Sequence, residues 1–264
     1  MPLWVKPSKK VSPKEVFDAM RDHYEGTPMD MTRDLGAGGC GLPYRWRPMS
    51  FEVDGTEYVN ERATATQQTG FWLVAQANRA AGDDLGILWF GVDDAATSCL
   101  TPIYCSIDRV PECLSENNGS MLKYSPTSMF WLFNRVTNFA YLRYDRMSKD
   151  LQAVADRWEN RVLGEVREVT AEARKLEGEA RVKDVTDYSV MMAQTLFDLW
   201  KQMDEYLLVK YIDGNVKGET EPGKFKDNGN GRDIPGEILF PGYDEKWQRA
   251  VAADNGETLK VIKN

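Results

Sequence analysis

The sequence has little of several residue types, and each shortage excludes a class of function. Its 264 residues include one histidine, His23, so any catalytic triad with a histidine base would depend on that residue. The four cysteines form no C-x-x-C pair and lie near no histidine, so we expect no metal site and assign no cofactor. Asp and Glu (41) outnumber Lys and Arg (33), and the net charge of −8 argues against a nucleic-acid or anionic-membrane partner.

Long apolar runs are also missing. The longest, 86–92 and 129–133, are far too short to span a bilayer. No charged segment followed by an apolar stretch opens the chain, so we expect no export signal in it, and its localisation stays open. Buried free thiols are the favoured interpretation of the cysteines, although a Cys99–Cys105 or Cys105–Cys113 bridge remains an alternative for an exported protein.

The run from 62 to 104 organises the rest of the chain. Residues 71–75 and 87–92 are dense in β-branched, aromatic and aliphatic side chains, and they are bounded by Gly, Asp or Asn, which predicts two strands. Neither alternates cleanly, so we expect both faces to be covered. The preceding polar stretch, 62–70, alternates with period two and predicts a further strand, with either a wet face or a lined pocket. The pocket is the sharper hypothesis.

The chain outside this run predicts one short helix and two long ones. Ser12-Pro13 with Glu15 forms a capping box for a helix that ends before Gly26. Glycine, proline and turn residues predict an irregular loop over 26–50 and a hairpin over 51–59 that turns at Asp54-Gly55. Helical periodicity predicts a helix from Met129 to Leu176, broken or bent near Gly164, and a second helix over 185–207 that stops at Asp213-Gly214. A short amphipathic piece follows over 243–252. The fold class is therefore α+β, with antiparallel strands followed by long helices. We expect a helix, loop and strand region over 1–124, a helical layer over 125–214 and an irregular tail over 215–264, all within one structural domain that forms half of a larger one.

Several long stretches resemble a known family. These stretches are RDHYEGTPMDMTRDLGAG, GLPYRWRP, NERATATQQTGFWLVAQ, ILWFGVDDAATSCLTPIYC and YLLVKYIDGNVK. In them the sequence is similar to the thiol dipeptidases of bacteria. That family belongs to the N-terminal-nucleophile hydrolases, and the secernins are its distant relatives. The resemblance runs from about Trp4 to the Pro-Gly-Tyr at 241–243. It covers the family's C-terminal half and leaves out the half that begins with the nucleophilic cysteine.

The resemblance implies a fold and an activity. The intact enzymes are four-layer α/β/β/α sandwiches, to which this part would supply strands and much of one helical layer. They hydrolyse dipeptides: the first-residue cysteine attacks the peptide carbonyl, and its own α-amine is the base. None of the cysteines here opens the chain, which begins Met1-Pro2-Leu3. We therefore expect no peptidase activity from this polypeptide alone.

An arginine is the residue type best suited to hold the carboxylate of a dipeptide, because its planar fork can donate two parallel hydrogen bonds. Arg62 is the first candidate, followed by Arg45 and Arg47, for which structural roles are favoured. For Arg62 both interpretations stay open. The resemblance adds His23, Glu25 and Asp30 as residues that shape the site, although a lone histidine near a helix end is more often a capping or packing residue. The hydrogen-bonding neighbours of Arg62 are Gln67, Gln68 and Thr69.

The adjacent acids Asp93-Asp94 favour a turn rather than an acid pair, because neighbouring side chains diverge on a strand.

Three functional hypotheses follow from these patterns. The first is the C-terminal portion of a cysteine-type dipeptidase, with a dipeptide substrate and a separate N-terminal half as partner. The second is a non-catalytic scaffold that pairs with such a half or forms a homo-oligomer through open strand edges. The third is a module that binds peptides without cleaving them.

Overall fold

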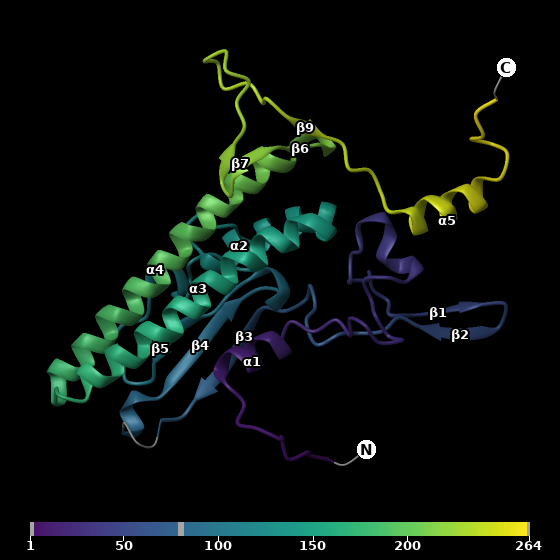
Figure 1. The fold of residues 1–264 in the computed structure, drawn as a ribbon. Coiled ribbons are helices and arrows are strands. Elements are labelled where there is room, and N and C mark those ends of the chain that lie inside the picture. Colours follow the sequence, from purple (N-terminus) through teal and green to yellow (C-terminus); the bar gives the residue numbers. More distant parts are fainter. Residues whose placement is uncertain (1–2, 79–81, 263–264) are drawn as a thin grey trace.

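The computed structural model describes residues 3–78 and 82–262 (Figure 1). A three-stranded antiparallel sheet lies beside long helices, which confirms the α+β class. The strands are β3 (Phe71–Gln76), β4 (Ile87–Val92) and β5 (Thr101–Tyr104), and the main helices are α1 (Pro13–Ala19), α2 (Met129–Ala140), α3 (Tyr144–Ala173) and α4 (Gly178–Tyr211).

The central sheet has the order β3-β4-β5 and buries one face against helices. Trp89 on β4 packs against Phe17 of α1 with 5.2 Å between ring centroids. Tyr104 on β5 reaches both long helices, because its backbone N–H donates to Ser189 of α4 and its hydroxyl lies 2.7 Å from the Thr170 hydroxyl of α3. The core of the molecule therefore sits between this face and the helices.

Glycine is required at one point of this face. Gly91 lies opposite Trp72 in the register of β3 and β4, and a Cβ at Gly91 would stand 2.6 Å from the indole nitrogen of Trp72. The missing side chain lets the indole lie flat on the neighbouring strand and donate to the Ser98 hydroxyl at 2.8 Å.

The opposite face of the sheet is open along β3 within the described residues, although Val92 and Thr101 on the same face are buried, so the expectation of two covered faces was wrong for β3. Phe71 is 61% exposed and Leu73 is 40% exposed, while Phe90 of β4 is half-buried beneath Phe71. The apolar run of β3 and β4 gave no periodic contrast between the two faces. Covered and bare faces therefore could not be distinguished from the pattern.

The break between the first helices lies elsewhere than expected. The chain leaves helical geometry at Arg143, between α2 and α3, and passes through Gly164 without interruption. Gly164 faces solvent, and its cost of about 1 kcal/mol in a helix is outweighed by the buried stripe of Trp158, Val162 and Val166. The end of α4 was predicted correctly: Asp213 and Gly214 follow with positive φ.

The remaining elements are small. β1 (Ser50–Val53) and β2 (Thr56–Val59) form the predicted hairpin, with Asp54 and Gly55 both at positive φ, as in a type I′ turn. The C-terminal segment pairs β6 (Val216–Lys217) with β9 (Ile238–Leu239) and β7 (Glu219–Glu221) with β8 (Lys224–Phe225), and ends in α5 (Glu245–Asn255), where a shorter amphipathic piece was predicted. Among the described residues no helix has the length and apolarity to cross a membrane.

A buried ion pair joins the chain just after α1 to α3. Glu159 is fully buried, and Arg21 donates to both of its oxygens, at 2.6 and 3.1 Å. The same guanidinium donates to the carbonyl oxygens of Ala95 and Ser98 and lies 5.0 Å from the Trp72 ring. One side chain thus connects the N-terminal helix, the sheet and the turn after β4.

We expect Glu159→Ala to lower the free energy of unfolding by about 3–5 kcal/mol, because it leaves the Arg21 guanidinium in the interior without its carboxylate. Denaturant unfolding followed by circular dichroism measures the loss. The exposed Glu168→Ala on the same helix should change stability by no more than about 0.5 kcal/mol. A double variant, Arg21→Met with Glu159→Leu, should recover much of the loss, and equal losses in the single and double variants would contradict the account.

Candidate functional site

The segment from Arg62 to Gln68 is not a strand: it bends at residues 64–65 and ends in a turn at Gln67-Gln68, so the strand prediction was wrong. Its burial does alternate: Ala63 and Ala65 are buried, whereas Arg62 and Thr64 are exposed. The segment runs beside the irregular chain that follows α1, and Ala65 donates its N–H to the carbonyl oxygen of Asp22. A ladder needs a neighbouring strand as well as a period of two. The neighbour here is a loop.

The segment lines a small hollow with the loop that precedes β1. The residues that border it are Met31, Tyr44, Arg45, Arg47, Met49, Glu61, Arg62, Ala63, Ala65, Thr66, Gln67 and Gln68. The Gln67 amide donates to the carbonyl oxygen of Arg45 at 2.8 Å and ties the two walls together. The volume of the hollow is about 10 Å³, room for one water molecule. A dipeptide would have to bind over this hollow rather than inside it.

The three arginines of the hollow differ in what they can do. Arg45 is buried, and its guanidinium donates to the carbonyl oxygens of Leu42 at 2.8 Å and Met31 at 3.0 Å and pairs with Asp34. Its donors are committed to the loop, which matches the structural role favoured for it. The guanidinium groups of Arg47 and Arg62 are exposed and have no carboxylate within 4 Å among the described residues.

His23 lies in a buried chain of polar groups rather than in the hollow. It is 1% exposed; its Nδ1 lies 3.1 Å from Glu25 Oε1, and its Nε2 lies 2.8 Å from the Tyr44 hydroxyl. The Tyr44 hydroxyl donates to Asp94, which also accepts from Tyr141 at 3.2 Å. Tyr44, Asp94 and Tyr141 were not predicted as partners of His23. They are distant in sequence, and no local pattern connects them.

Charge is distributed unevenly along this chain of groups. Partial burial opposes ionisation of Glu25, but hydrogen bonds from the side chain and backbone of His23 outweigh burial and lower its pKa to about 2. Burial raises the pKa of Asp94 although Tyr44 donates to it, and burial with the nearby Asp94 raises the pKa of Tyr44 well above its usual value. The arrangement holds Tyr44 and the adjacent Arg45 in place.

The end of α1 also differs from the prediction. The helix begins with the predicted capping box at Ser12 and Glu15 but ends at Ala19, several residues before Gly26. The N–H of His23 donates to the Glu25 carboxylate and that of Tyr24 donates to Asp22, so side chains replace the helical acceptors.

Asp30 and Thr69 both form local contacts. Asp30 accepts from the N–H groups of Gly26 and Thr32 at 3.1 and 2.9 Å, which closes the loop after α1. The Thr69 hydroxyl donates to the Thr66 carbonyl oxygen at 2.7 Å and closes the turn that carries Gln67 and Gln68. Neither residue borders the hollow.

The cysteines are free thiols, and burial raises the pKa of three of them. Burial raises the pKa of Cys99 well above its usual value, that of Cys113 to about 11, and that of Cys40 to a smaller extent. Nucleophilic attack requires the thiolate, so these shifts oppose a catalytic role. Cys105 is exposed. The described residues contain no group of three or more His, Cys, Asp or Glu side chains that could hold a metal ion.

A comparison with protein-family models places this site within a known family. The model of peptidase family C69 matches residues 1–157, which is more than half of the chain and includes the whole hollow. The chain belongs to peptidase family C69. Membership connects it with enzymes that hydrolyse peptide bonds. A search of curated proteins finds no match.

Asp93 and Asp94 lie in a turn and diverge, as expected for these adjacent acids. Asp93 has a φ of 64° and accepts from the Asn134 amide at 2.8 Å, whereas Asp94 points to Tyr44. The second carboxylate oxygen of Asp93 is buried and has no hydrogen-bond partner among the described residues. Burial raises the pKa of this carboxyl to about 6, although the Asn134 amide donates to it.

This shift predicts a pH-dependent stability. The folded protein retains the Asp93 proton up to about pH 6, whereas an unfolded aspartate loses it near its ordinary pKa of 3.8, so stability falls as pH rises between these values. We expect Asp93→Asn to raise the free energy of unfolding by about 2–3 kcal/mol at pH 8 and to have little effect at pH 4. Urea unfolding at both pH values measures the difference, and an equal effect at both would contradict the account.

Proposed function

We propose that this chain supplies the substrate-binding portion of a cysteine-type dipeptidase and that a segment outside these 264 residues supplies the nucleophile. One observation carries the proposal: the exposed side chains of Arg47 and Arg62, which pair with no carboxylate among the described residues, lie beside Gln67 and Gln68, within the part that matches the peptidase family. The raised pKa values of Cys40, Cys99 and Cys113 support a nucleophile from elsewhere. In this proposal the chain alone is inactive.

The chemistry follows from the side chains that remain available. Arg62 binds the carboxylate of a dipeptide through two parallel hydrogen bonds, and Arg47 adds a second positive charge. The exposed Gln68 amide is free to donate to the peptide carbonyl, on which negative charge develops when a thiolate attacks. Because the hollow is too small to enclose a dipeptide, the substrate lies over it, between these residues and the segment that carries the cysteine.

The bare face of the sheet supports the need for a further layer. Phe71 and Leu73 stand exposed on β3, beside the half-buried Leu88 and Phe90 of β4. An apolar sheet face of this kind is normally buried against another sheet or helices. A second sheet on this face would complete the α/β/β/α sandwich that the resemblance implies.

The same face suits a second candidate function. Two copies of this chain could bury their apolar faces against each other and form a non-catalytic homo-oligomer. A peptide-binding module without cleavage would use the same arginines as the dipeptidase. Oligomeric state and turnover separate these candidates from the split enzyme.

We expect the purified chain to bind a dipeptide such as Ala-Ala weakly and not to hydrolyse it. Arg62→Ala should weaken binding by about tenfold, because it removes a charge-assisted pair of hydrogen bonds. Arg232→Ala removes an exposed arginine from the C-terminal loop and serves as the matched control, with unchanged affinity. Isothermal calorimetry gives the affinity, and release of free alanine gives the turnover.

Mixing with the cysteine-bearing portion of another family C69 peptidase should produce hydrolysis that depends on Arg62. Phe71→Glu should leave the lone chain folded, because the side chain is exposed, but should prevent this activation. Hydrolysis by the lone chain would overturn the proposal. A stable homo-oligomer that gains no activity on mixing would favour the scaffold.

A further inference from the structure

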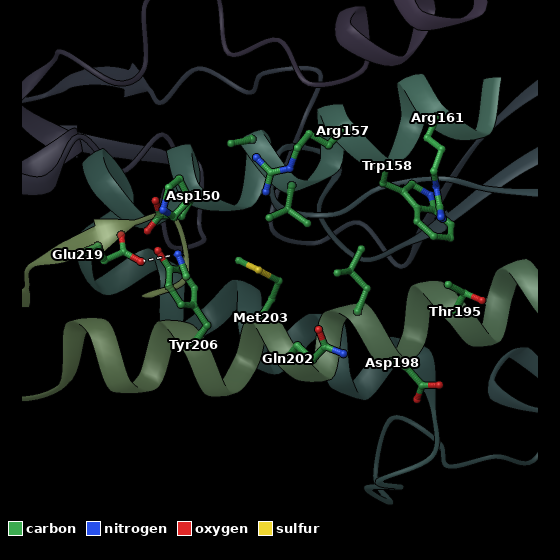
Figure 2. A pocket seen from close by; sticks show the side chains of 15 residues that line it. Asp150, Arg157, Trp158, Arg161, Thr195, Asp198, Gln202, Met203, Tyr206 and Glu219 are labelled. Atoms are coloured by element: carbon green, nitrogen blue, oxygen red, sulfur yellow. Dashed lines mark hydrogen bonds between the residues drawn. The ribbon is translucent and has the colours of Figure 1, made fainter. Parts of the chain in front are cut away.

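A groove of about 950 Å³ lies between α3 and α4, on the helical side of the molecule (Figure 2). It follows α3 from Asp150 to Arg161 and α4 from Thr195 to Tyr206, about 16 Å along each helix at ~1.5 Å per residue. Its volume is typical of sites that bind ligands or peptide segments. It shares no residue with the hollow beside Arg62.

The floor of the groove is apolar. Val154 of α3 and Leu199 and Met203 of α4 line its centre, and Figure 2 shows Met203 pointing from α4 toward α3. Methionine is unbranched and flexible, so it adapts to the shape of an apolar partner. Met203 is already buried, whereas Val154 and Leu199 are half-buried and would lose their remaining exposure if the space between the helices were filled.

One end of the groove carries two acids that share a single lysine. The turn between β7 and β8 lies there, and Lys210 bonds the Asp150 carboxylate at 2.9 Å and that of Glu219 at 2.8 Å. Lys210 compensates one of the two negative charges, so this end keeps a net charge of about −1, and an acidic partner has to place its carboxylates farther along the groove, at Arg157 and Arg161.

The charges along the two edges of the groove differ in sign. On α3, Arg157 and Arg161 stand one turn apart; Arg161 lies 4.9 Å from the Trp158 ring and 3.5 Å from Glu165. Arg157 has no carboxylate within 4 Å among residues 3–78 and 82–262, and Figure 2 shows it reaching over the groove. The α4 edge carries Asp198 and Gln202, also one turn apart.

We propose that this groove binds an amphipathic helix of a protein partner, with about three turns in contact, and that acidic side chains on one flank of that helix pair with Arg157 and Arg161. A length of about 16 Å matches three helical turns, and a helix presents apolar residues at i, i+3/i+4 and i+7 to such a floor. The arginine forks select carboxylates.

Other occupants fit these observations less well. A nucleic acid would meet Asp198 on the far edge and a protein with a net charge of −8. An anionic amphiphile would pair with the arginine edge but leave Asp198 and Gln202 uncovered. A helix with acidic residues on one flank and basic or amide residues on the other satisfies both edges. The proposal does not rest on dipeptidase activity, because α4 lies outside the family match.

The test is a displayed library of helical peptides, about 18 residues long so that they fold, with a leucine stripe and randomised flanks. Selection on the full chain should enrich peptides with acidic residues on one flank. Fluorescence anisotropy with an enriched peptide then measures affinity. Arg157→Glu and Arg161→Glu should each weaken binding by at least about tenfold, because attraction becomes repulsion.

Arg167→Glu is the matched control, since it makes the same charge change on an exposed position of α3 outside this groove, and its affinity should equal that of the wild type. Circular dichroism and the thermal midpoint verify that each variant is folded. Raising the salt from about 50 to 500 mM should weaken wild-type binding, because it screens the attraction, and should strengthen the residual binding of an Arg157→Glu, Arg161→Glu double variant, because it screens the repulsion.

Several outcomes would overturn the proposal. These are the absence of enriched peptides, enrichment of basic flanks, or equal binding to wild type and Arg157→Glu. Sedimentation that shows a wild-type dimer, dissociated by Arg157→Glu, would assign the groove to a second copy of the chain instead. Displacement of an enriched peptide by micromolar dodecanoate would assign it to an anionic amphiphile.

Discussion

The buried ion pair between Arg21 and Glu159 is the interaction on which the arrangement of the site depends. A carboxylate in the interior is costly unless its charge is compensated and its oxygens are hydrogen-bonded, so α1 must approach α3 closely at this point. Arg21 lies directly before Asp22, whose carbonyl oxygen holds Ala65. The ion pair therefore positions the loop after α1, and this loop positions the segment that carries Arg62.

The polar residues around the hollow divide into two groups with different roles. Arg45, His23 and Asp30 direct their hydrogen bonds inward, to loop carbonyls, buried side chains or backbone N–H groups, and hold the loops in place. Arg47, Arg62 and Gln68 are exposed and keep donors available for a ligand. Inner residues that hold the loops in place also fix the positions from which the exposed side chains reach a ligand, which limits the loss of entropy on binding.

The molecule also carries two surfaces suited to bind a partner: a flat apolar sheet face and a groove with charged edges. The outer face of β3 and β4 is broad and apolar, with Phe71 and Leu73 exposed, and suits another sheet. The groove between α3 and α4 has an apolar floor with arginines on one edge, and suits a helix. A flat apolar face confers little selectivity, whereas the charged edges of a groove restrict which partner can bind.

The sequence alone determined those features that depend on neighbours within a few residues. Local hydrogen bonds and positive φ values account for the capping box at Ser12, the Asp54-Gly55 hairpin and the end of α4 at Asp213-Gly214. Local composition predicted the strands at 71–75 and 87–92, of which the first extends to Gln76 in the structure. The resemblance in its motifs agreed with the family match.

Tertiary structure decided the features that depend on distant residues. The segment from Arg62 to Gln68 alternates like a strand but lies beside a loop, so it forms no ladder. Tertiary structure also decided the chain of hydrogen bonds from His23 through Tyr44 to Asp94 and Tyr141, and the exposure of the outer face of β3. Such contacts join residues tens of positions apart, and the free energy that selects them arises from burial in the folded protein, which no short stretch of sequence contains.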